Sequence, residues 1–320
     1  MIIKTPLDIQ KLVDKARSTF AKNEKGLAKQ LSTGDSLTRP KEDKDFVVWT
    51  GGTHWQILTH LKGIPFGRVI QISGKPDSGK STHAMGFMKM AQEQNVLVIN
   101  WDAERKFNAG RFDAHIKGDS KSLLIVDTNN ISQGCKDVAI FVHAAKEMDP
   151  KVKILIVWDS VGSSVNSSED KEDTEEYSKQ PGVTAKEVAA AIRKFNKLMN
   201  KYIDRETGEE TIATLVINQT YANIGSVGQT EKGGGELYYL SSVIIQLGRK
   251  QDLTRVKEKR RYKYGIVTRA KVKKNHLFEG NESIAELDLV ISADGVHLAD
   301  EVKNYKDIEG WDDPAEGDEE

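Results

Sequence analysis

The sequence has one cysteine and no long apolar run, and each absence excludes a class of protein. Cys135 has no partner for an internal disulfide, so a reducing compartment is expected. No apolar run approaches the roughly 18 residues of a membrane span. The opening residues 1–6 lack the long apolar region of a signal peptide. We therefore expect a cytoplasmic protein with no membrane partner, of neither the disulfide-rich nor the membrane class.

The net charge of −1, from 47 basic and 48 acidic side chains, conceals strong segregation along the chain. Residues 249–274 contain twelve Lys or Arg and two acids, whereas residues 307–320 contain eight acids and no base. Such segregation predicts a polyanionic partner and an acidic tail that competes with it. The alternative for the basic stretch, which includes an expected hairpin at 257–264, is a solvated surface.

The pattern of apolar residues predicts an α/β fold. Continuous apolar strands separated by helices indicate a mostly parallel central sheet that is covered on both faces. Strands are expected at 68–73, 96–101, 123–126, 154–158 and 213–218, and helices at 81–94, 132–148 and 184–202. Later strands without long helices between them predict an antiparallel extension at the C-terminal side, and these lie at 242–247, 265–273 and 285–291.

Three regions are expected along the chain. Residues 1–45 contain a helix at 6–30 and a polar linker at 32–45; this helix either packs as ordinary core or docks on a neighbouring subunit. Residues 46–299 form the core. Residues 300–320 form a loose acidic tail. No repeat at a solenoid period is present.

A phosphate-binding loop is the clearest motif. Residues 74–81 match G-x-x-x-x-G-K-[ST] between an expected strand and an expected helix, a context that disfavours a chance glycine turn. Glycines let backbone amides face phosphates, and the helix N-terminus adds partial positive charge. The motif predicts ATP and Mg²⁺, with the Lys80 ammonium at the β and γ phosphates and the Ser81 hydroxyl on the metal. The candidate ATP-binding residues are Gly74, Lys75, Pro76, Asp77, Ser78, Gly79, Lys80 and Ser81.

Three polar side chains at strand ends are expected to face the same crevice, because ligands bind at the carboxyl ends of strands in open α/β sheets. Asp159 is the candidate Mg²⁺ carboxylate, and a capping Asp is the alternative. Glu104 is the candidate general base, and a polar helix start is the alternative. Gln219 is the candidate sensor of the γ-phosphate, and an amide that caps its strand is the alternative.

Two long loops follow these strand ends. Residues 220–235 contain five glycines, so their backbone can approach a sugar-phosphate chain, although a plain mobile loop fits equally well. Residues 162–182 carry six Asp or Glu side chains, which argue against simple electrostatic binding of DNA by this loop. The candidate DNA-contacting residues of the first loop are Tyr221, Ile224, Lys232, Gly233, Gly234 and Gly235.

The order and content of these motifs resemble the RecA recombinase family, particularly its phage branch, over roughly residues 45–295. The segments that carry the resemblance are Gly67–Ser81, Asn100–Glu104, Val157–Ser160 and Val216–Gln219. The resemblance implies a RecA-like P-loop ATPase core. It also implies that Glu104 is the catalytic glutamate, that Asp159 binds Mg²⁺ and that Gln219 senses ATP.

The same resemblance implies contacts with DNA and between subunits. By the resemblance, the loops 163–183 and 220–239 correspond to the family's DNA-binding loops. Lys186 and Arg193 match positions that face the DNA backbone. Residues 268–276 resemble the segment that reaches the neighbour's ATP, with Lys274 and His276 at its basic positions. The leading helix becomes the piece that packs on the next subunit, and the tail from Asp312 resembles an autoinhibitory tail.

The chain departs from the bacterial members of that family in three places. His276 stands where a second lysine is usual, so its charge depends on pH. Tyr238 occupies a position that is often basic. No long C-terminal DNA-gathering domain is obvious after the core, and the hairpin around Arg260 is the candidate for its place.

The resemblance implies an ATP-dependent DNA strand-exchange recombinase, and hence a DNA-dependent, Mg²⁺-dependent ATPase of recombination and repair. Its implied partners are single-stranded DNA, homologous duplex DNA, further copies of the chain in a helical filament, and single-strand binding and mediator proteins. If the chain is phage-encoded, it is expected in the host cytoplasm. The alternatives are a ring helicase or motor with the same core, a single-strand annealing or mediator protein, and a regulatory ATPase unrelated to DNA.

Overall fold

The computed structural model describes residues 42–50, 53–166, 182–204, 207–222, 229–231, 234–257, 259–277 and 286–302. The helix expected at 6–30, most of the linker and the acidic tail lie outside these residues. So do Ile224, Lys232, Gly233 and most of the loop 163–183.

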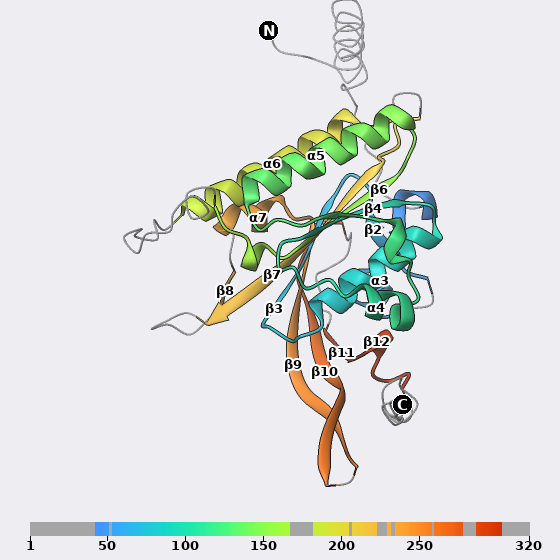
Figure 1. The fold of residues 1–320 in the computed structure, drawn as a ribbon, viewed down its shortest axis with the longest axis vertical. Coiled ribbons are helices and arrows are strands. Elements are labelled where there is room, and N and C mark those ends of the chain that lie inside the picture. Colours follow the sequence, from blue (N-terminus) through green and yellow to red (C-terminus); the bar gives the residue numbers. More distant parts are fainter. Residues whose placement is uncertain are drawn as a thin grey trace, which may run out of the picture.

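One large sheet organises the described part of the chain (Figure 1). Its strands are β3 (Val69–Gly74), β4 (Leu97–Asp102), β5 (Leu123–Val126), β6 (Ile154–Asp159), β7 (Ile212–Ala222), β8 (Gln229–Glu231), β9 (Val243–Lys257), β10 (Arg260–Asn275), β11 (Glu286–Ser292) and β12 (Gly295–Leu298). The order is β12-β11-β10-β9-β3-β7-β6-β4-β5, with β8 paired to β7. Neighbours from β9 to β5 along this order are parallel, and β9 to β12 are antiparallel. The predicted mostly parallel sheet with an antiparallel extension is confirmed.

Helices cover both faces of the parallel strands. The helices are α2 (Thr53–Thr59), α3 (Lys80–Glu93), α4 (Ala109–Arg111), α5 (Ile131–Met148), α6 (Val183–Lys201) and α7 (Gly234–Leu240). In Figure 1, α5 and α6 lie side by side across one face, while α3 lies on the other. Each face buries its own core because strands that are apolar at every position offer side chains to both sides. The expected boundaries of α3, α5 and α6 agree with the structure to within one residue.

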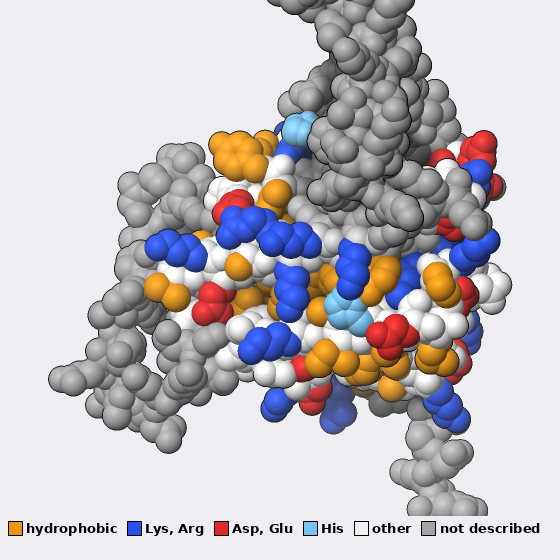
Figure 2. Space-filling view, turned by 90° about the horizontal axis from the view of Figure 1, so that it is seen from above, with side chains coloured by type: hydrophobic (Ala, Val, Ile, Leu, Met, Phe, Trp, Pro, Cys, Tyr) orange, Lys and Arg blue, Asp and Glu red, His pale blue; other side chains and the backbone are white. Residues whose placement is uncertain are grey.

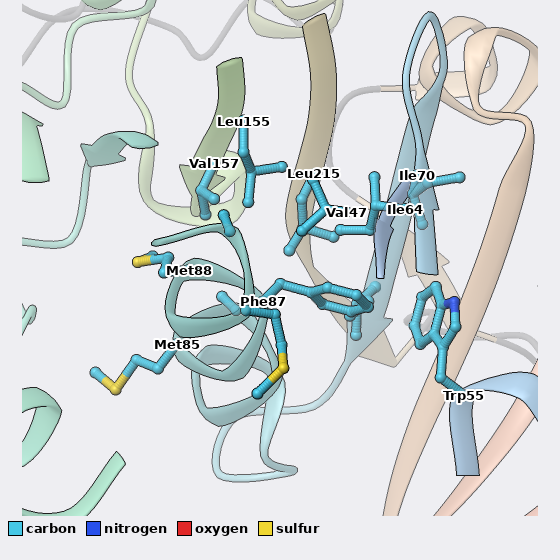
Figure 3. Close-up of a cluster of buried hydrophobic side chains, with 14 of the residues drawn as sticks. Val47, Trp55, Ile64, Ile70, Met85, Phe87, Met88, Leu155, Val157 and Leu215 are labelled. Carbon is cyan, nitrogen blue, oxygen red and sulfur yellow. The ribbon is translucent and has the colours of Figure 1, made fainter. Parts of the chain in front are cut away.

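The core beneath α3 joins the phosphate-loop helix to a part of the fold that the sequence did not reveal. Phe87 and Met88 of α3 pack with Trp55 of α2 in one fully buried cluster (Figure 3). A two-stranded antiparallel sheet, β1 (Phe46–Val48) with β2 (Gly63–Pro65), contributes to the same cluster. The described residues also include short helical turns, namely η3 (Asp43–Asp45), η4 (Phe112–Ile116), η5 (Ser120–Ser122) and η6 (Val161–Ser163).

A buried lysine ties the end of α5 to the sheet. Lys146 is 4% exposed, and its ammonium donates to the carbonyls of Pro150 at 3.1 Å and Val152 at 2.6 Å and to the Thr211 hydroxyl oxygen at 2.7 Å. Burial lowers the pKa of Lys146 to about 8. The three acceptors replace water around the charge, so the side chain joins α5, the turn before β6 and the residue that precedes β7.

Replacing Lys146 by methionine is expected to lower the free energy of unfolding by about 2–4 kcal/mol, because buried acceptors lose their donor while the apolar stem is kept. Urea unfolding measures the change. Lys136→Met is the matched control, because Lys136 is an exposed lysine on the same helix, and its effect should stay within about 0.5 kcal/mol. Equal losses in the two variants would contradict the role assigned to Lys146.

Candidate functional site

The phosphate-binding loop connects the end of β3 to the start of α3, as the motif predicts. Its two glycines are required sterically. A Cβ atom at Gly74 would lie 2.4 Å from the Leu247 carbonyl oxygen, and one at Gly79 would lie 2.8 Å from Cγ1 of Ile291. Gly79 also has a φ of +92°, which side-chain-bearing residues rarely adopt. The loop backbone is therefore held close between β9 and β11, with its amides at the N-terminus of α3.

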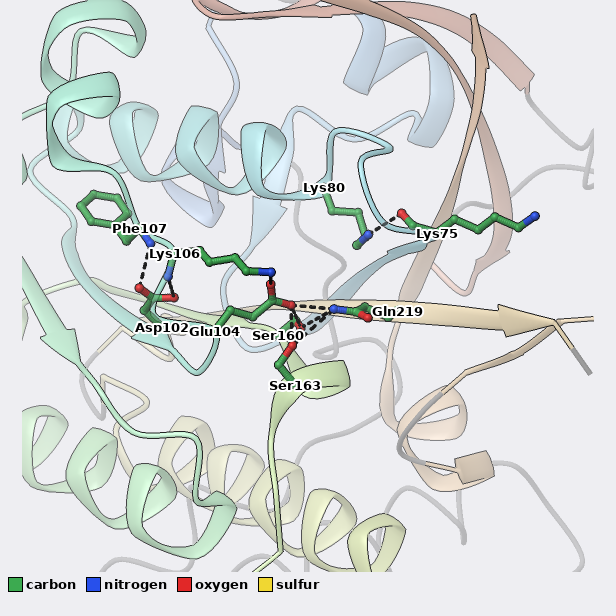
Figure 4. Close-up of polar contacts among 9 residues, drawn as sticks. All are labelled: Lys75, Lys80, Asp102, Glu104, Lys106, Phe107, Ser160, Ser163 and Gln219. Atoms are coloured by element: carbon green, nitrogen blue, oxygen red, sulfur yellow. Dashed lines mark hydrogen bonds and ion pairs between the residues drawn. The ribbon is translucent and has the colours of Figure 1, made fainter. Parts of the chain in front are cut away.

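The Lys80 side chain forms a hydrogen bond within this loop. Its side chain is 7% exposed, and its ammonium donates to the Lys75 carbonyl oxygen at 2.7 Å (Figure 4). Burial lowers the pKa of Lys80, while the carboxylates of Asp159 and Glu104 favour its charged form. The ammonium thus lies over the loop whose amides suit a phosphate.

Two carboxylates meet where β4 and β6 end. These strands are parallel neighbours, and the register places Asp102 beside Asp159. The Asp102 carboxylate accepts the backbone N–H groups of Lys106 at 3.2 Å and Phe107 at 2.8 Å, so it closes its own turn. The Asp159 carboxylate accepts the hydroxyl of Ser81. The Mg²⁺ role therefore fits Asp159 better than Asp102.

Negative charge is in excess around Asp159. Burial raises the pKa of Asp159 to about 6; the Ser81 hydrogen bond and Lys80 lower it, and the charges of Glu104 and Asp102 raise it further. A divalent cation would relieve this repulsion, and carboxylate and hydroxyl oxygens are the ligands that Mg²⁺ prefers. The chemistry of Ser81 and Asp159 therefore fits a bound Mg²⁺.

Glu104 is surrounded by hydrogen-bond donors (Figure 4). Its Oε1 accepts the hydroxyls of Ser160 at 2.5 Å and Ser163 at 2.7 Å and the side-chain amide of Gln219 at 2.6 Å. Its Oε2 accepts the Lys106 ammonium at 2.8 Å. Burial would raise the pKa of Glu104, but the hydrogen bonds from Lys106, Ser160 and Ser163 outweigh it and lower the pKa to about 2. The carboxylate is firmly ionised and becomes a stronger base only as donors withdraw.

Gln219 connects this carboxylate to β7. The side chain lies directly over Gly162, where a Cβ atom would be 2.6 Å from Cγ of Gln219. The sequence predicted Glu104, Asp159 and Gln219 at neighbouring strand ends, and the structure brings Glu104 and Gln219 into direct contact. It did not predict Lys106, Ser160 or Ser163 as partners of Glu104. The available signal was their position, since each follows a site carboxylate by four residues or fewer.

Most of the chain is similar to proteins of one known family. A family model described as the RecA N-terminal domain matches residues 23–296. The chain belongs to the RecA family. It is 28% identical to the protein RecA of Cytophaga hutchinsonii over 272 residues, which is 84% of this chain and 68% of that one. It is 27% identical to the protein RecA of an Arthrobacter species over 286 residues, with 88% and 74% of the two chains covered.

Membership of the RecA family supports a RecA-type function in recombination and repair. At the level of the family, this means ATP binding, DNA binding and DNA-dependent ATP hydrolysis with Mg²⁺. No helix among the described residues is long and apolar enough to span a membrane.

The Lys274 side chain makes its contacts within its own chain. The side chain is 8% exposed, and its ammonium donates to the carbonyls of Tyr238 at 2.7 Å and Tyr239 at 3.0 Å, at the end of α7. It also lies 5.0 Å from the centre of the Tyr238 ring, a cation–π contact. Burial lowers the pKa of Lys274. His276, two residues further on, is exposed.

The candidate DNA contacts that the structure describes lie on or near α6 and α7. Lys186 and Arg193 are exposed on α6, and Arg193 forms an ion pair with Glu236 of α7. Figure 2 looks down on α5 and α6 and shows lysine and arginine side chains gathered on that face. Gly234 begins α7, Gly235 is exposed in its first turn, and Tyr221 lies near the end of β7.

A pair of buried histidines lies behind the phosphate loop. His54 of α2 and His83 of α3 are 1% and 2% exposed, with ring centres 5.8 Å apart. Nδ1 of His83 donates to the Gly79 carbonyl oxygen, whereas Nε2 of His54 has no hydrogen-bond partner. Burial, together with the charges of His83 and His297, lowers the pKa of His54 to about 3. His54 is therefore neutral in the folded protein near pH 7.

Replacing His54 by phenylalanine is expected to stabilise the protein increasingly as the pH falls below about 6. The folded state holds His54 neutral while the unfolded chain takes up a proton, so the wild type loses about 1.4 kcal/mol per pH unit more than the variant in this range. Burial also lowers the pKa of His83 to about 4, but this residue affects both proteins alike. Near pH 7 the variant should already be as stable or more so, since it removes an unsatisfied polar atom. Thermal unfolding of both proteins at pH 7 and pH 5 tests this. A difference that is independent of pH would contradict a neutral His54.

Proposed function

We propose that this chain is an ATP-dependent strand-exchange recombinase that forms a helical filament on single-stranded DNA. The observation that carries the proposal is the 2.6 Å hydrogen bond between Gln219 and Glu104. It joins the candidate general base to β7, whose last residues, 220–222, begin the glycine-rich segment 220–235. A hydrolysis site and a candidate DNA loop are thereby mechanically connected.

The residues of the site have distinct roles in this proposal. The loop 74–80 binds the phosphates, and Ser81 and Asp159 hold Mg²⁺. ATP supplies a γ-phosphate whose loss distinguishes two states of the protein. Glu104 orients and deprotonates the attacking water once its donors withdraw. Gln219 transmits the nucleotide state to the glycine-rich segment.

Subunit contacts complete the proposed site. Lys274 and His276 are proposed to approach the ATP bound by a neighbouring subunit, as finger-type cations do. For Lys274 this requires release from the carbonyls at the end of α7, a contact that the isolated chain makes at 2.7 Å and 3.0 Å. Residues 1–45 are proposed to pack on the next subunit, and residues 300–320 to compete with DNA.

The proposed DNA contacts are the exposed cations of α6 and the glycine-rich segment. They comprise Lys186, Arg193, Tyr221, Ile224, Lys232, Gly233, Gly234 and Gly235. We assign the chain to the phage branch of the family, with the host cytoplasm as its place of action. Homologous duplex DNA and single-strand binding or mediator proteins are its proposed partners.

ATP turnover with and without single-stranded DNA, combined with electron microscopy of the same mixtures, tests the proposal. We expect turnover to rise when the DNA is added and filaments to form with ATP and DNA together. Closed rings would favour a helicase or motor. Turnover that is unchanged by DNA would favour a regulatory ATPase whose function is unrelated to DNA. Strand annealing without ATP would favour an annealing or mediator protein.

A further inference from the structure

The outer halves of β9 and β10 form a two-stranded ribbon that projects from the body of the molecule (Figure 1). β9 pairs with β3 only through residues 243–247, and β10 pairs with β11 only through residues 265–271. Beyond these points each strand pairs only with the other, among the strands that the structure describes. The ribbon contributes little to the core beyond Leu253, so core packing does not explain its length.

The cations at the base of this ribbon are paired with carboxylates. Lys250 and Arg269 pair with Asp288 at 2.7 Å and 2.8 Å, and Lys271 pairs with Glu286 at 2.5 Å. Each of these cations has a carboxylate within direct contact. The base is therefore a set of ordinary surface ion pairs.

The tip has a different character. Residues 255–263 contain six Lys or Arg and one acid, Glu258. Lys259, Arg260 and Arg261 are exposed and form no ion pair with any residue that the structure describes. The register places Arg260 directly opposite Lys257, although like charges in that position destabilise a strand pair.

The backbone conformation at the turn is also unfavourable for the lysine found there. Lys259 has a φ of +64°, a conformation that glycine or asparagine adopts more readily than lysine. The tip thus keeps a cation at a position where the turn favours an uncharged residue. Both features oppose stability, and both concentrate charge at the end of a projecting element.

We infer that the tip of the β9–β10 ribbon, centred on Lys259, Arg260 and Arg261, binds the phosphate backbone of duplex DNA. A two-stranded ribbon fits the major groove, where exposed Lys and Arg reach the phosphates on either side. Duplex is favoured over single-stranded DNA because binding of single strands uses exposed aromatic rings. The aromatic residues nearest the tip, Tyr262 and Tyr264, are only partly exposed. This inference rests on the proposed function for its biological meaning, with the duplex as the partner that a recombinase compares with its bound strand.

The test uses the full chain and the combined variant Lys259→Gln, Arg260→Gln and Arg261→Gln. The matched control removes the same charge from exposed positions elsewhere, with Lys117→Gln, Lys121→Gln and Lys136→Gln. Binding is measured without nucleotide, by fluorescence anisotropy with a labelled random-sequence duplex and with one of its strands alone, between about 50 and 200 mM salt. Thermal unfolding verifies that both variants are folded.

We expect the tip variant to bind duplex at least about tenfold more weakly than the control at the middle of this salt range. Its plot of log affinity against log salt should be shallower by about two to three, because the slope falls by about one for each phosphate that is no longer neutralised. Single-strand binding should change less than about twofold between the variants. Equal duplex affinities and slopes in the two variants would overturn the inference, and so would equal weakening toward single strands and duplex.

Stimulation of ATP turnover by single-stranded DNA, measured in the same two variants, separates this inference from the proposed function. Stimulation should survive in both. If the wild type shows none, the recombinase proposal fails, whereas a loss of duplex binding confined to the tip variant would still establish the ribbon as a duplex-binding surface.

Discussion

Replacing Glu104 by glutamine will lower ATP turnover at least about a hundredfold while nucleotide binding stays close to that of the wild type. Glutamine has nearly the same shape as glutamate but cannot accept a proton from water. Its carbonyl oxygen can take the place of Oε1 and accept the donors from Ser160, Ser163 and Gln219. The phosphate loop and Lys80 are unchanged by this substitution, so binding should persist.

Steady-state turnover and binding of a fluorescent ATP analogue measure the two effects separately. Lys80→Ala is the companion variant, because it removes the ammonium that lies over the phosphate loop and should weaken binding as well as turnover. Glu104→Gln with normal turnover would show that another group activates water. A variant that loses binding together with turnover would show that Glu104 holds the site in shape.

Part of the fold could be predicted because buried segments have a recognisable apolar pattern in the sequence. β5 was predicted with its observed bounds, since four apolar residues stand between polar ones. The hairpin expected at 257–264 is confirmed by the β9–β10 turn. Both strands nevertheless run far beyond the bounds predicted at 242–247 and 265–273, because their outer halves lie outside the core and carry charged residues. Apolar patterning reports burial, so strands held only by ladder hydrogen bonds escape it. α2 and the β1–β2 pair are too short to show a period.

The candidate site, too, could be predicted only in part. Asp159, Glu104 and Gln219 could be placed because parallel strands end at one edge of the sheet, which fixes their backbones. Their side-chain partners could not, since the donors to Glu104 depend on how the turns after β4 and β6 fold over one another. Lys274 is a further example: the resemblance implies a contact with the neighbour's ATP, which stays a prediction, and the contact of its ammonium with the end of α7 in the same chain was not foreseen.

Replacing Gln219 by alanine will remove most of the stimulation of ATP turnover by single-stranded DNA, while turnover without DNA stays the same or rises. The Gln219 amide is one of three donors to Oε1 of Glu104. Its loss makes Glu104 a slightly stronger base, but it also breaks the side-chain contact that joins Glu104 to β7. Coupling between sites of this kind usually amounts to about 1–3 kcal/mol, so the ratio of turnover with DNA to turnover without it should fall about tenfold.

Ser163→Ala distinguishes coupling from a direct effect on the base. The Ser163 hydroxyl donates to the same oxygen of Glu104 at 2.7 Å, but Ser163 lies in η6 after β6 and has no place in β7. This variant should raise the basal rate in the same way and keep the response to DNA. If both variants lose the response equally, the effect comes from the hydrogen bonding of Glu104 alone. If Gln219→Ala keeps the full response to DNA, the Gln219 amide is not needed to transmit the nucleotide state to the glycine-rich segment.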